Sequence, residues 1–166
     1  MELKDFISKL SSYNLFTNLL PGILFVFIVT EFTSFNLFFE PVYFGIFLYY
    51  FIGVALNRVG SLVIEPILIY FKFIKRIDYP KFVKAGKMDK KINILLGENN
   101  VYRSLAALFL SLLATMGYEW LTVKVLFIDT HGNIIIVVLL FVIFLFAYRK
   151  QTKYIVERCE DNLNEQ

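Results

Sequence analysis

The chain has little of the chemistry that builds disulfide frameworks, metal centres or soluble surfaces. Its 166 residues include one cysteine, Cys159, and one histidine, His131. One cysteine excludes an internal disulfide framework, and the two residues together are too few for a common zinc site. Charged residues make up only 19%, against about 25% in an average soluble domain. Low-complexity disorder is excluded as well, because disordered segments are poor in apolar residues.

Apolar and aromatic side chains are present in excess. Hydrophobic residues make up 58% of the chain, with 19 Phe and 10 Tyr, and the mean hydropathy is +0.64. A single core of this size does not bury that much apolar surface, so the surplus must face something other than water. Lipid is the expected environment.

Four apolar stretches are long enough, or nearly so, to cross a bilayer as helices, which takes roughly 20 residues each. They cover about residues 13–30, 38 or 42 to 56, 102–120 and 134–148. We therefore predict an all-α integral membrane protein with four transmembrane helices. Residues 1–56 hold the first two helices, 57–101 the inner end of the second and a basic segment, 102–148 the last two helices, and 149–166 a charged tail.

Basic residues concentrate on one side of this topology. Two lie in the N-terminal segment (Lys4 and Lys9), ten lie within residues 57–103 and four in the tail, whereas Lys124 alone lies in a loop on the other side. Lys and Arg are enriched in cytoplasmic loops. Both termini and the basic segment are therefore expected in the cytoplasm. The first apolar stretch has no small-residue cleavage site after it and is expected to be retained as a membrane span.

The segment between the second and third helices is predicted to form an amphipathic helix. Residues 82–96 place apolar side chains on one helical face and lysines on another. Asp78 is expected to begin this helix, Gly97 to end it, and Asn99 or Asn100 to cap the third membrane helix. The candidate ligand-binding residues are its basic side chains, Lys72, Lys75, Arg76, Lys81, Lys84, Lys87, Lys90 and Lys91. Either they touch anionic lipid at the inner leaflet or, repeated around an oligomer, they bind a polyanion such as a nucleotide or an oligonucleotide.

A polar line interrupts the apolar surface of the second helix. Asn57, Ser61 and Glu65 recur at every fourth residue, and Arg58 lies beside them. At 1.5 Å per residue from Val42, Arg58 lies about 24 Å along the helix and Glu65 about 34 Å, against a hydrocarbon core of about 30 Å. These four polar residues are candidates for a pore or gate around an oligomeric axis. The alternative is an interfacial anchor with an Arg58–Glu65 contact.

Prolines and glycines predict local features of the first two helices. Pro66 disfavours an unbroken helix, so the apolar residues 67–74 are expected to bend along the membrane or to pack against other copies of the chain. Pro21 marks a second potential kink. Gly53 and Gly60 would let another helix approach closely.

No catalytic signature is present in the sequence. No Ser or Cys nucleophile has a recognisable base, and neither paired carboxylates nor a zinc-protease motif occurs. His131 lies in the segment DTHGN, which is typical of a turn. The chain is therefore not expected to be an enzyme, and no cofactor or metal is predicted.

Three stretches together, SSYNLFTNLLPG, NRVGSLVIEPIL and GENNVYRS, resemble small four-span proteins of bacterial anti-phage defence islands. The nearest resemblance is to the Hailong-type transmembrane effector, the partner of a nucleotidyltransferase. The resemblance implies a tetrameric channel of the bacterial inner membrane that stays shut until infection. It also implies control from the inside by an oligonucleotide made by the partner. On that analogy the basic residues of 72–91 face the ligand and the polar line of 57–65 lies near the gate.

The sequence leaves three hypotheses for function. The first is an ion-conducting effector that depolarises the host cell. The second is a non-conducting membrane anchor that recruits a cytoplasmic partner through residues 57–100. The third is a small cation-coupled transporter, which is disfavoured because Glu65 lies too near the cytoplasm and the long basic segment would have no role.

Overall fold

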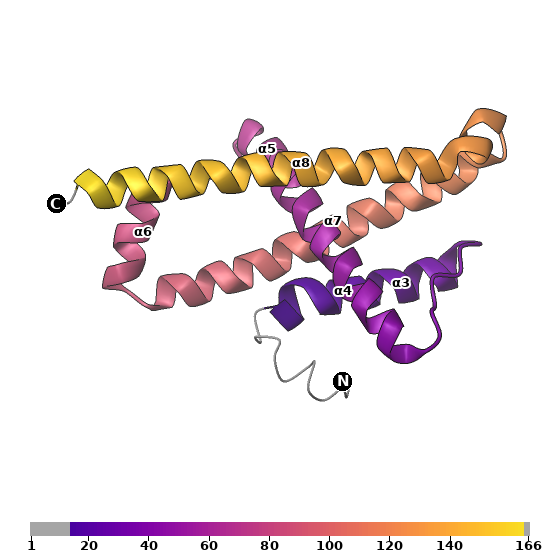
Figure 1. Ribbon diagram of the computed structural model, residues 1–166, viewed down its shortest axis with the longest axis horizontal. Coiled ribbons are helices and arrows are strands. Elements are labelled where there is room, and N and C mark those ends of the chain that lie inside the picture. Colours follow the sequence, from indigo (N-terminus) through magenta and orange to yellow (C-terminus); the bar gives the residue numbers. More distant parts are fainter. Residues whose placement is uncertain (1–13, 165–166) are drawn as a thin grey trace.

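The computed structural model describes residues 14–164, apart from the side chains of residues 126–130, 133, 161, 162 and 164, and every element in this range is a helix (Figure 1). In chain order the elements are η1 (Leu15–Leu19), α3 (Leu20–Phe32), α4 (Val42–Val59), η2 (Gly60–Ile64), α5 (Glu65–Tyr70), α6 (Tyr79–Met88), α7 (Lys91–Thr122) and α8 (Leu126–Asn164). Lys4 and Lys9 lie outside the described residues.

Four helical segments are long and apolar enough to cross a membrane, as predicted. They are Leu15–Phe32, Val42–Tyr70, Lys91–Thr122 and Ile134–Glu160. Continuous elements form each of them: η1 with α3, then α4 with η2 and α5, then α7, then α8. The fold is therefore consistent with a multi-pass membrane protein.

Successive membrane-length helices run in opposite directions, and α7 and α8 extend beyond α3 at one end of the bundle (Figure 1). Hydrogen bonds join Asn57 to both Asn18 and Arg103, and Ser61 to Lys150. We call this end of the bundle, which the helices of all four spans share, the basic end. At the other end the Ser34 amide donates to Glu119 Oε1 at 2.7 Å. We call that one, which carries Glu31, Glu40 and Glu119, the acidic end.

Both prolines of the first two spans lie just after a π-helical turn. In η1 the N–H of Leu20 donates to the Leu15 carbonyl, and in η2 the N–H of Glu65 donates to the Gly60 carbonyl. Each proline is the next residue. A proline ring collides with the preceding turn and offers no N–H, and a π turn locally widens the helix to accommodate such a defect.

The prediction that Pro66 breaks the second helix is therefore wrong. The helix continues through Pro66 to Tyr70. The chain then turns, with Lys72 in the left-handed region at φ 58°. The aromatic residues Tyr70, Phe71 and Phe73 at this turn are all strongly exposed.

The core lies between α3, α4 and α7, where Val26, Val29, Leu56 and Leu108 are buried. The first two spans cross in direct backbone contact, which only glycine permits, because a Cβ on Gly53 would overlap the Asn18 carbonyl. A Cβ on Gly22 would overlap the Tyr49 carbonyl in the same way. The close approach expected at Gly53 thus occurs within one chain.

The segment between the second and third spans departs from the predicted single helix. Asp78 precedes the first residue of α6, as expected, but α6 ends at Met88 and α7 begins at Lys91. The Asp89 side chain accepts the N–H of Lys91 at 2.8 Å across this break, and Lys90 is the N-cap of the new helix. The predicted stop at Gly97 and cap at Asn99 or Asn100 are therefore wrong, because α7 runs through all three residues.

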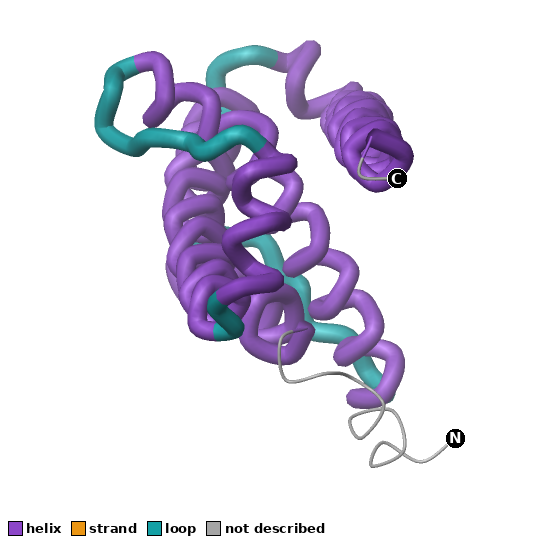
Figure 2. Tube along the Cα trace, turned by 90° about the vertical axis from the view of Figure 1, so that its left-hand side faces the viewer, coloured by secondary structure: helices purple, strands orange, loops and turns teal. Residues whose placement is uncertain are grey.

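Helix α8 is longer than the predicted fourth span at both ends. Residues 129–133, expected as a turn around His131, are helical, and the charged tail continues the same helix to Asn164. Figure 2 shows α8 nearly end-on and standing to one side of the other helices. Phe144 of α8 stacks on Phe51 of α4, with ring centroids 5.7 Å apart.

Candidate functional site

The polar line of the second span faces the interior of the bundle. Asn57 and Ser61 are buried, and the Glu65 side chain is only 17% exposed. The buried polar residues described in the structure all lie near the basic end: Thr17, Asn18, Asn57, Ser61, Asn100 and Ser104. Polar side chains in an apolar bundle are stable only when other polar groups satisfy them. The basic end therefore holds a polar interior built from three spans.

Asn57 bridges the first and third spans. Its Nδ2 donates to Asn18 Oδ1 at 3.1 Å, and its Oδ1 accepts from Arg103 at 3.0 Å. The side-chain amide can do both at once because it carries a donor and an acceptor on one carbon. An apolar residue of similar size at position 57 would break both contacts.

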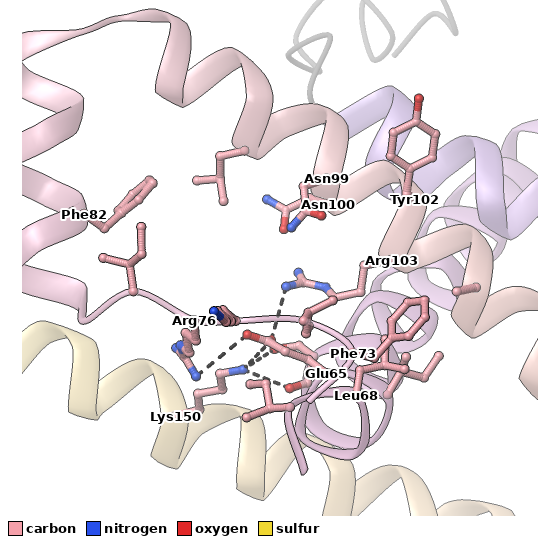
Figure 3. Close-up of a pocket in the computed structure, with 18 of the residues that line it drawn as sticks. Glu65, Leu68, Phe73, Arg76, Phe82, Asn99, Asn100, Tyr102, Arg103 and Lys150 are labelled. Atoms are coloured by element: carbon pink, nitrogen blue, oxygen red, sulfur yellow. Dashed lines mark hydrogen bonds and ion pairs between the residues drawn. The ribbon is translucent and has the colours of Figure 1, made fainter. Parts of the chain in front are cut away.

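Glu65 is the centre of an ion cluster (Figure 3). Its carboxylate lies 3.0 Å from Lys150 Nζ, 3.5 Å from Arg103 and 3.7 Å from Arg76. These three cations come from α8, α7 and the connector between α5 and α6. One carboxylate thus joins three separate segments to the end of the second span, and the cluster keeps an excess of positive charge.

Lys150 is anchored by three oxygen atoms. Besides Glu65, its ammonium group donates to the carbonyl and to the hydroxyl oxygen of Ser61, each at 2.8 Å. These bonds use all three N–H donors of a lysine. The contact holds α8 against η2, and it explains why the ammonium group tolerates a position that is only 22% exposed.

Arg76 ties the connector to both α5 and α8. Its guanidinium group pairs with Glu65 and lies over the Tyr154 ring, 5.3 Å from the centroid. Tyr79, the first residue of α6, also stacks on the Tyr154 ring, with ring centroids 4.9 Å apart. A displacement of α6 would therefore alter its contact with Tyr154 on α8 and, through Arg76, the ion pair with Glu65.

A half-open cavity of about 670 Å³ lies beside the ion cluster. Its charged lining consists of Glu65 and the five cations Arg58, Lys75, Arg76, Arg103 and Lys150. The remaining walls carry aliphatic and aromatic side chains, with Asn99 and Asn100 from α7. The volume is in the range of small-molecule sites, about 300–1,000 Å³.

The structure separates the predicted ligand-binding residues into four groups. Lys75 and Arg76 line the cavity, and Lys72 forms the turn after α5. Lys81, Lys84 and Lys87 form an exposed face of α6, on which Lys81 pairs with Asp78 at 3.1 Å. The remaining two, Lys90 and Lys91, are exposed at the break between α6 and α7.

Sequence reasoning missed two site residues, Arg103 and Lys150, which were counted only as part of the charge distribution. Their position held a signal: each lies at the end of an apolar run, where a charged side chain needs a nearby partner. The predicted contact between Arg58 and Glu65 does not form. Arg58 lines the cavity, and the ion-pair partners of Glu65 are those named above.

Metal-ligating residues do not cluster in the described part of the chain, where no group of three or more His, Cys, Asp or Glu side chains comes together. Cys159 is an exposed free thiol on α8. Comparison with known proteins finds no matching family model, no matching curated protein and no matching solved structure.

Proposed function

We propose that the protein is an oligomeric membrane channel of bacterial anti-phage defence, gated from the cytoplasm by a nucleotide or an oligonucleotide, and that its opening depolarises the host membrane. The observation that carries the proposal is the Glu65 cluster. A single carboxylate holds cations from the connector, α7 and α8 at the end of the bundle where basic residues concentrate. The resemblance to the Hailong-type effector gives the same assignment.

The basic end is assigned to the cytoplasm. Lys and Arg are enriched in cytoplasmic segments of membrane proteins, and the ends of the spans that carry them meet at this end. In this orientation both chain termini and α6 are cytoplasmic, and the membrane is the bacterial inner membrane. A ligand made in the cytoplasm then has direct access to the basic residues.

The ligand acts by competing with Glu65 for its cations. Phosphate oxygens form charge-assisted hydrogen bonds with guanidinium groups as strong as those of a carboxylate. A polyanion held by the exposed lysines of α6 therefore draws Arg76 away from Glu65. Loss of this ion pair releases the connector and alters the pairing of Glu65 with Arg103 and Lys150, which set the positions of α7 and α8.

The interior of the bundle supplies a reason for a closed resting state. Ser104 is fully buried near the basic end, and its hydroxyl has no hydrogen-bond partner among the described residues. Farther along, Val26 and Val29 make the core apolar. Apolar constrictions stop ions because they exclude water. We infer that ions do not pass through the core of a single subunit, so the path that the ligand opens runs between subunits.

An oligomer is part of the proposal, because apolar side chains close the buried core of one bundle. Large apolar side chains are exposed along the spans, for example Phe47, Phe109 and Phe141. These side chains face lipid or a neighbouring subunit. The resemblance assigns a tetramer and a nucleotidyltransferase as the source of the ligand.

Ion flux from vesicles tests the proposal directly. The purified full chain is reconstituted in potassium-loaded liposomes, and efflux is followed with and without single-stranded oligonucleotides and ATP. We expect a ligand-dependent change in efflux of tenfold or more. Glu65→Gln should abolish the dependence on ligand, because it removes the charge for which the ligand competes.

The matched control is Glu157→Gln, since Glu157 is also on a long helix and pairs with a lysine, Lys153, at 3.6 Å. Its efflux should equal that of the wild type. The proposal fails if intact oligomers conduct no ions under any ligand condition. It also fails if Glu65→Gln and Glu157→Gln respond to ligand alike.

One observation favours the second hypothesis, a non-conducting anchor. The lysines of α6 form an exposed face while Phe82, Val83 and Ala85 are half-buried, an arrangement that suits a docking surface. The anchor hypothesis predicts that charge reversal at Lys84, Lys87 and Lys90 abolishes recruitment of a partner. It also predicts that Asn57→Ala leaves toxicity unchanged, whereas the channel hypothesis predicts a change.

A further inference from the structure

The cavity beside Glu65 has a charge that its own carboxylate does not balance. Five cations and one carboxylate line it. The carboxylate is already occupied by Arg76, Arg103 and Lys150. Arg58 and Lys75 add two further positive charges on the wall. A net positive site in a partly apolar surround attracts an anion, because its charges are screened less there than in bulk water.

The same cavity has apolar walls that a soluble anion would not need. Leu68 and Ile69 of α5 and Phe73 of the connector line it. Next to it on the outside of the chain, Ile67, Tyr70 and Phe71 are exposed. Charged and apolar surfaces therefore meet at the rim of the cavity. That combination fits a molecule with an anionic head and hydrocarbon chains.

The cations lie at one level of the bundle. At 1.5 Å per residue, Arg58 is about 24 Å from Val42, Lys150 about 24 Å from Ile134, and Arg103 about 26 Å from Trp120. Each distance approaches the thickness of the hydrocarbon core, about 30 Å. With the apolar parts of the spans in the core, the cation-lined cavity lies where the lipid phosphates of one leaflet lie.

We propose that this cavity binds the phosphodiester headgroup of an anionic phospholipid, whose chains run along α5 and the adjoining span. Basic pockets between membrane helices bind such headgroups. Arg58 and Lys75 bind the phosphate, since neither is an ion-pair partner of Glu65. A zwitterionic lipid binds less well, because its cationic group meets five cations and a carboxylate that is already paired. The inference rests on the membrane insertion assumed in the proposed function, but not on conduction or on a nucleotide ligand.

Lipid retention tests the inference. The purified full chain is incubated in detergent with phosphatidylglycerol, with phosphatidylcholine, or with glycerophosphate, and bound molecules are counted by native mass spectrometry alongside the thermal unfolding midpoint. We expect phosphatidylglycerol to be retained at least tenfold more than phosphatidylcholine and to raise the midpoint. Equal retention of the two lipids would overturn the inference. Binding of glycerophosphate with the affinity of the intact lipid would also overturn it, because the ligand would then be a soluble phosphate.

A pair of double variants locates the site. Arg58→Gln with Lys75→Gln removes two cavity cations, and Lys124→Gln with Lys153→Gln removes two exposed cations outside the cavity lining. The first pair should lower phosphatidylglycerol retention about tenfold, and the second should leave it unchanged. Equal retention by both pairs would overturn the assignment to this cavity. If the first pair does not fold, the comparison of lipids on the wild type still decides the question.

The lipid-retention and ion-flux experiments test the lipid site and the channel separately. Selective retention without ligand-gated flux refutes the channel and keeps the lipid site. Gated flux that is the same in vesicles with and without phosphatidylglycerol, together with unselective retention, refutes the lipid site and keeps the channel.

Discussion

The two ends of the bundle are held together in different ways. At the basic end the contacts join residues far apart in sequence and are buried or partly buried: Asn57 with Asn18, and Glu65 with Arg103 and Lys150. At the acidic end they are exposed, as in the Ser34–Glu119 hydrogen bond. Lys124 over the Trp120 ring is a local contact there. At the basic end one change thus affects several helices, whereas at the acidic end the Ser34–Glu119 hydrogen bond joins only two segments.

The largest expected difference between the ends is steric. Gly53→Ala places a Cβ onto the backbone carbonyl of Asn18, whereas a Cβ at Gly117 meets nothing within 4 Å. We expect Gly53→Ala to prevent formation of the native bundle, seen as loss of a monodisperse peak in size-exclusion chromatography. Gly117→Ala should stabilise α7 by about 0.5–1 kcal/mol, the usual gain for alanine over glycine in a helix. Native elution of Gly53→Ala would contradict the close crossing.

The next difference is electrostatic. Glu65→Ala leaves three cations close together without their shared carboxylate. Removing one partner of a buried ion pair costs about 3–5 kcal/mol. The free energy of unfolding, measured by circular dichroism during titration of mixed micelles with sodium dodecyl sulfate, should fall by the lower end of that range, because Glu65 and its partners are only partly buried. Glu119→Ala at the acidic end should leave it unchanged, and equal effects would show that the two ends are held alike.

Asn57 and Asn36 offer a smaller comparison between side-chain amides. Asn57→Ala removes hydrogen bonds to two other spans, whereas Asn36→Ala removes one exposed contact with the amide of Phe38. Leaving buried partners unsatisfied costs about 1–3 kcal/mol. The same micelle titration should show this loss for Asn57→Ala and none for Asn36→Ala. A neutral Asn57→Ala would mean that Arg103 and Asn18 find other partners.

Lys124→Gln should have the smallest effect. Its ammonium group lies 3.8 Å from the centre of the Trp120 ring, and an exposed cation–π contact contributes about 0.5–1 kcal/mol. The fluorescence of Trp120, the single tryptophan of the chain, should change because the cation is lost, with little change in the unfolding free energy. A loss comparable to that of Asn57→Ala would show that the acidic end is also coupled.

Several features of the fold were predictable because they depend on neighbours in sequence. The four apolar spans, the start of α6 after Asp78 and the regular spacing of the polar line are of this kind. The effect of Pro66 was predicted wrongly. A proline does disturb a helix, but the π turn ahead of it absorbs the disturbance within the span. Likewise Gly97, which was predicted to end a helix, lies inside the 32-residue helix α7.

The site itself was predicted only in part. The polar line was recognisable in the sequence because Asn57, Ser61 and Glu65 interrupt an apolar helix. Their partners Arg103 and Lys150 did not, since pairing depends on which ends of the spans meet. That is a property of the assembled bundle and leaves no periodic signal in the chain.

Composition predicted more apolar surface than a soluble core buries, the lengths of the apolar runs predicted helices, and the distribution of lysine and arginine predicted one basic end. Hydropathy and charge act residue by residue, so no folding of the chain alters them. The direction in which the polar line points was decided by packing. The glycine crossing at Gly53 turns Asn57 toward Asn18, and the return of α8 brings Lys150 to Glu65. Buried charges must be neutralised by groups at hydrogen-bond distance, and only the assembled helices determine which groups those are.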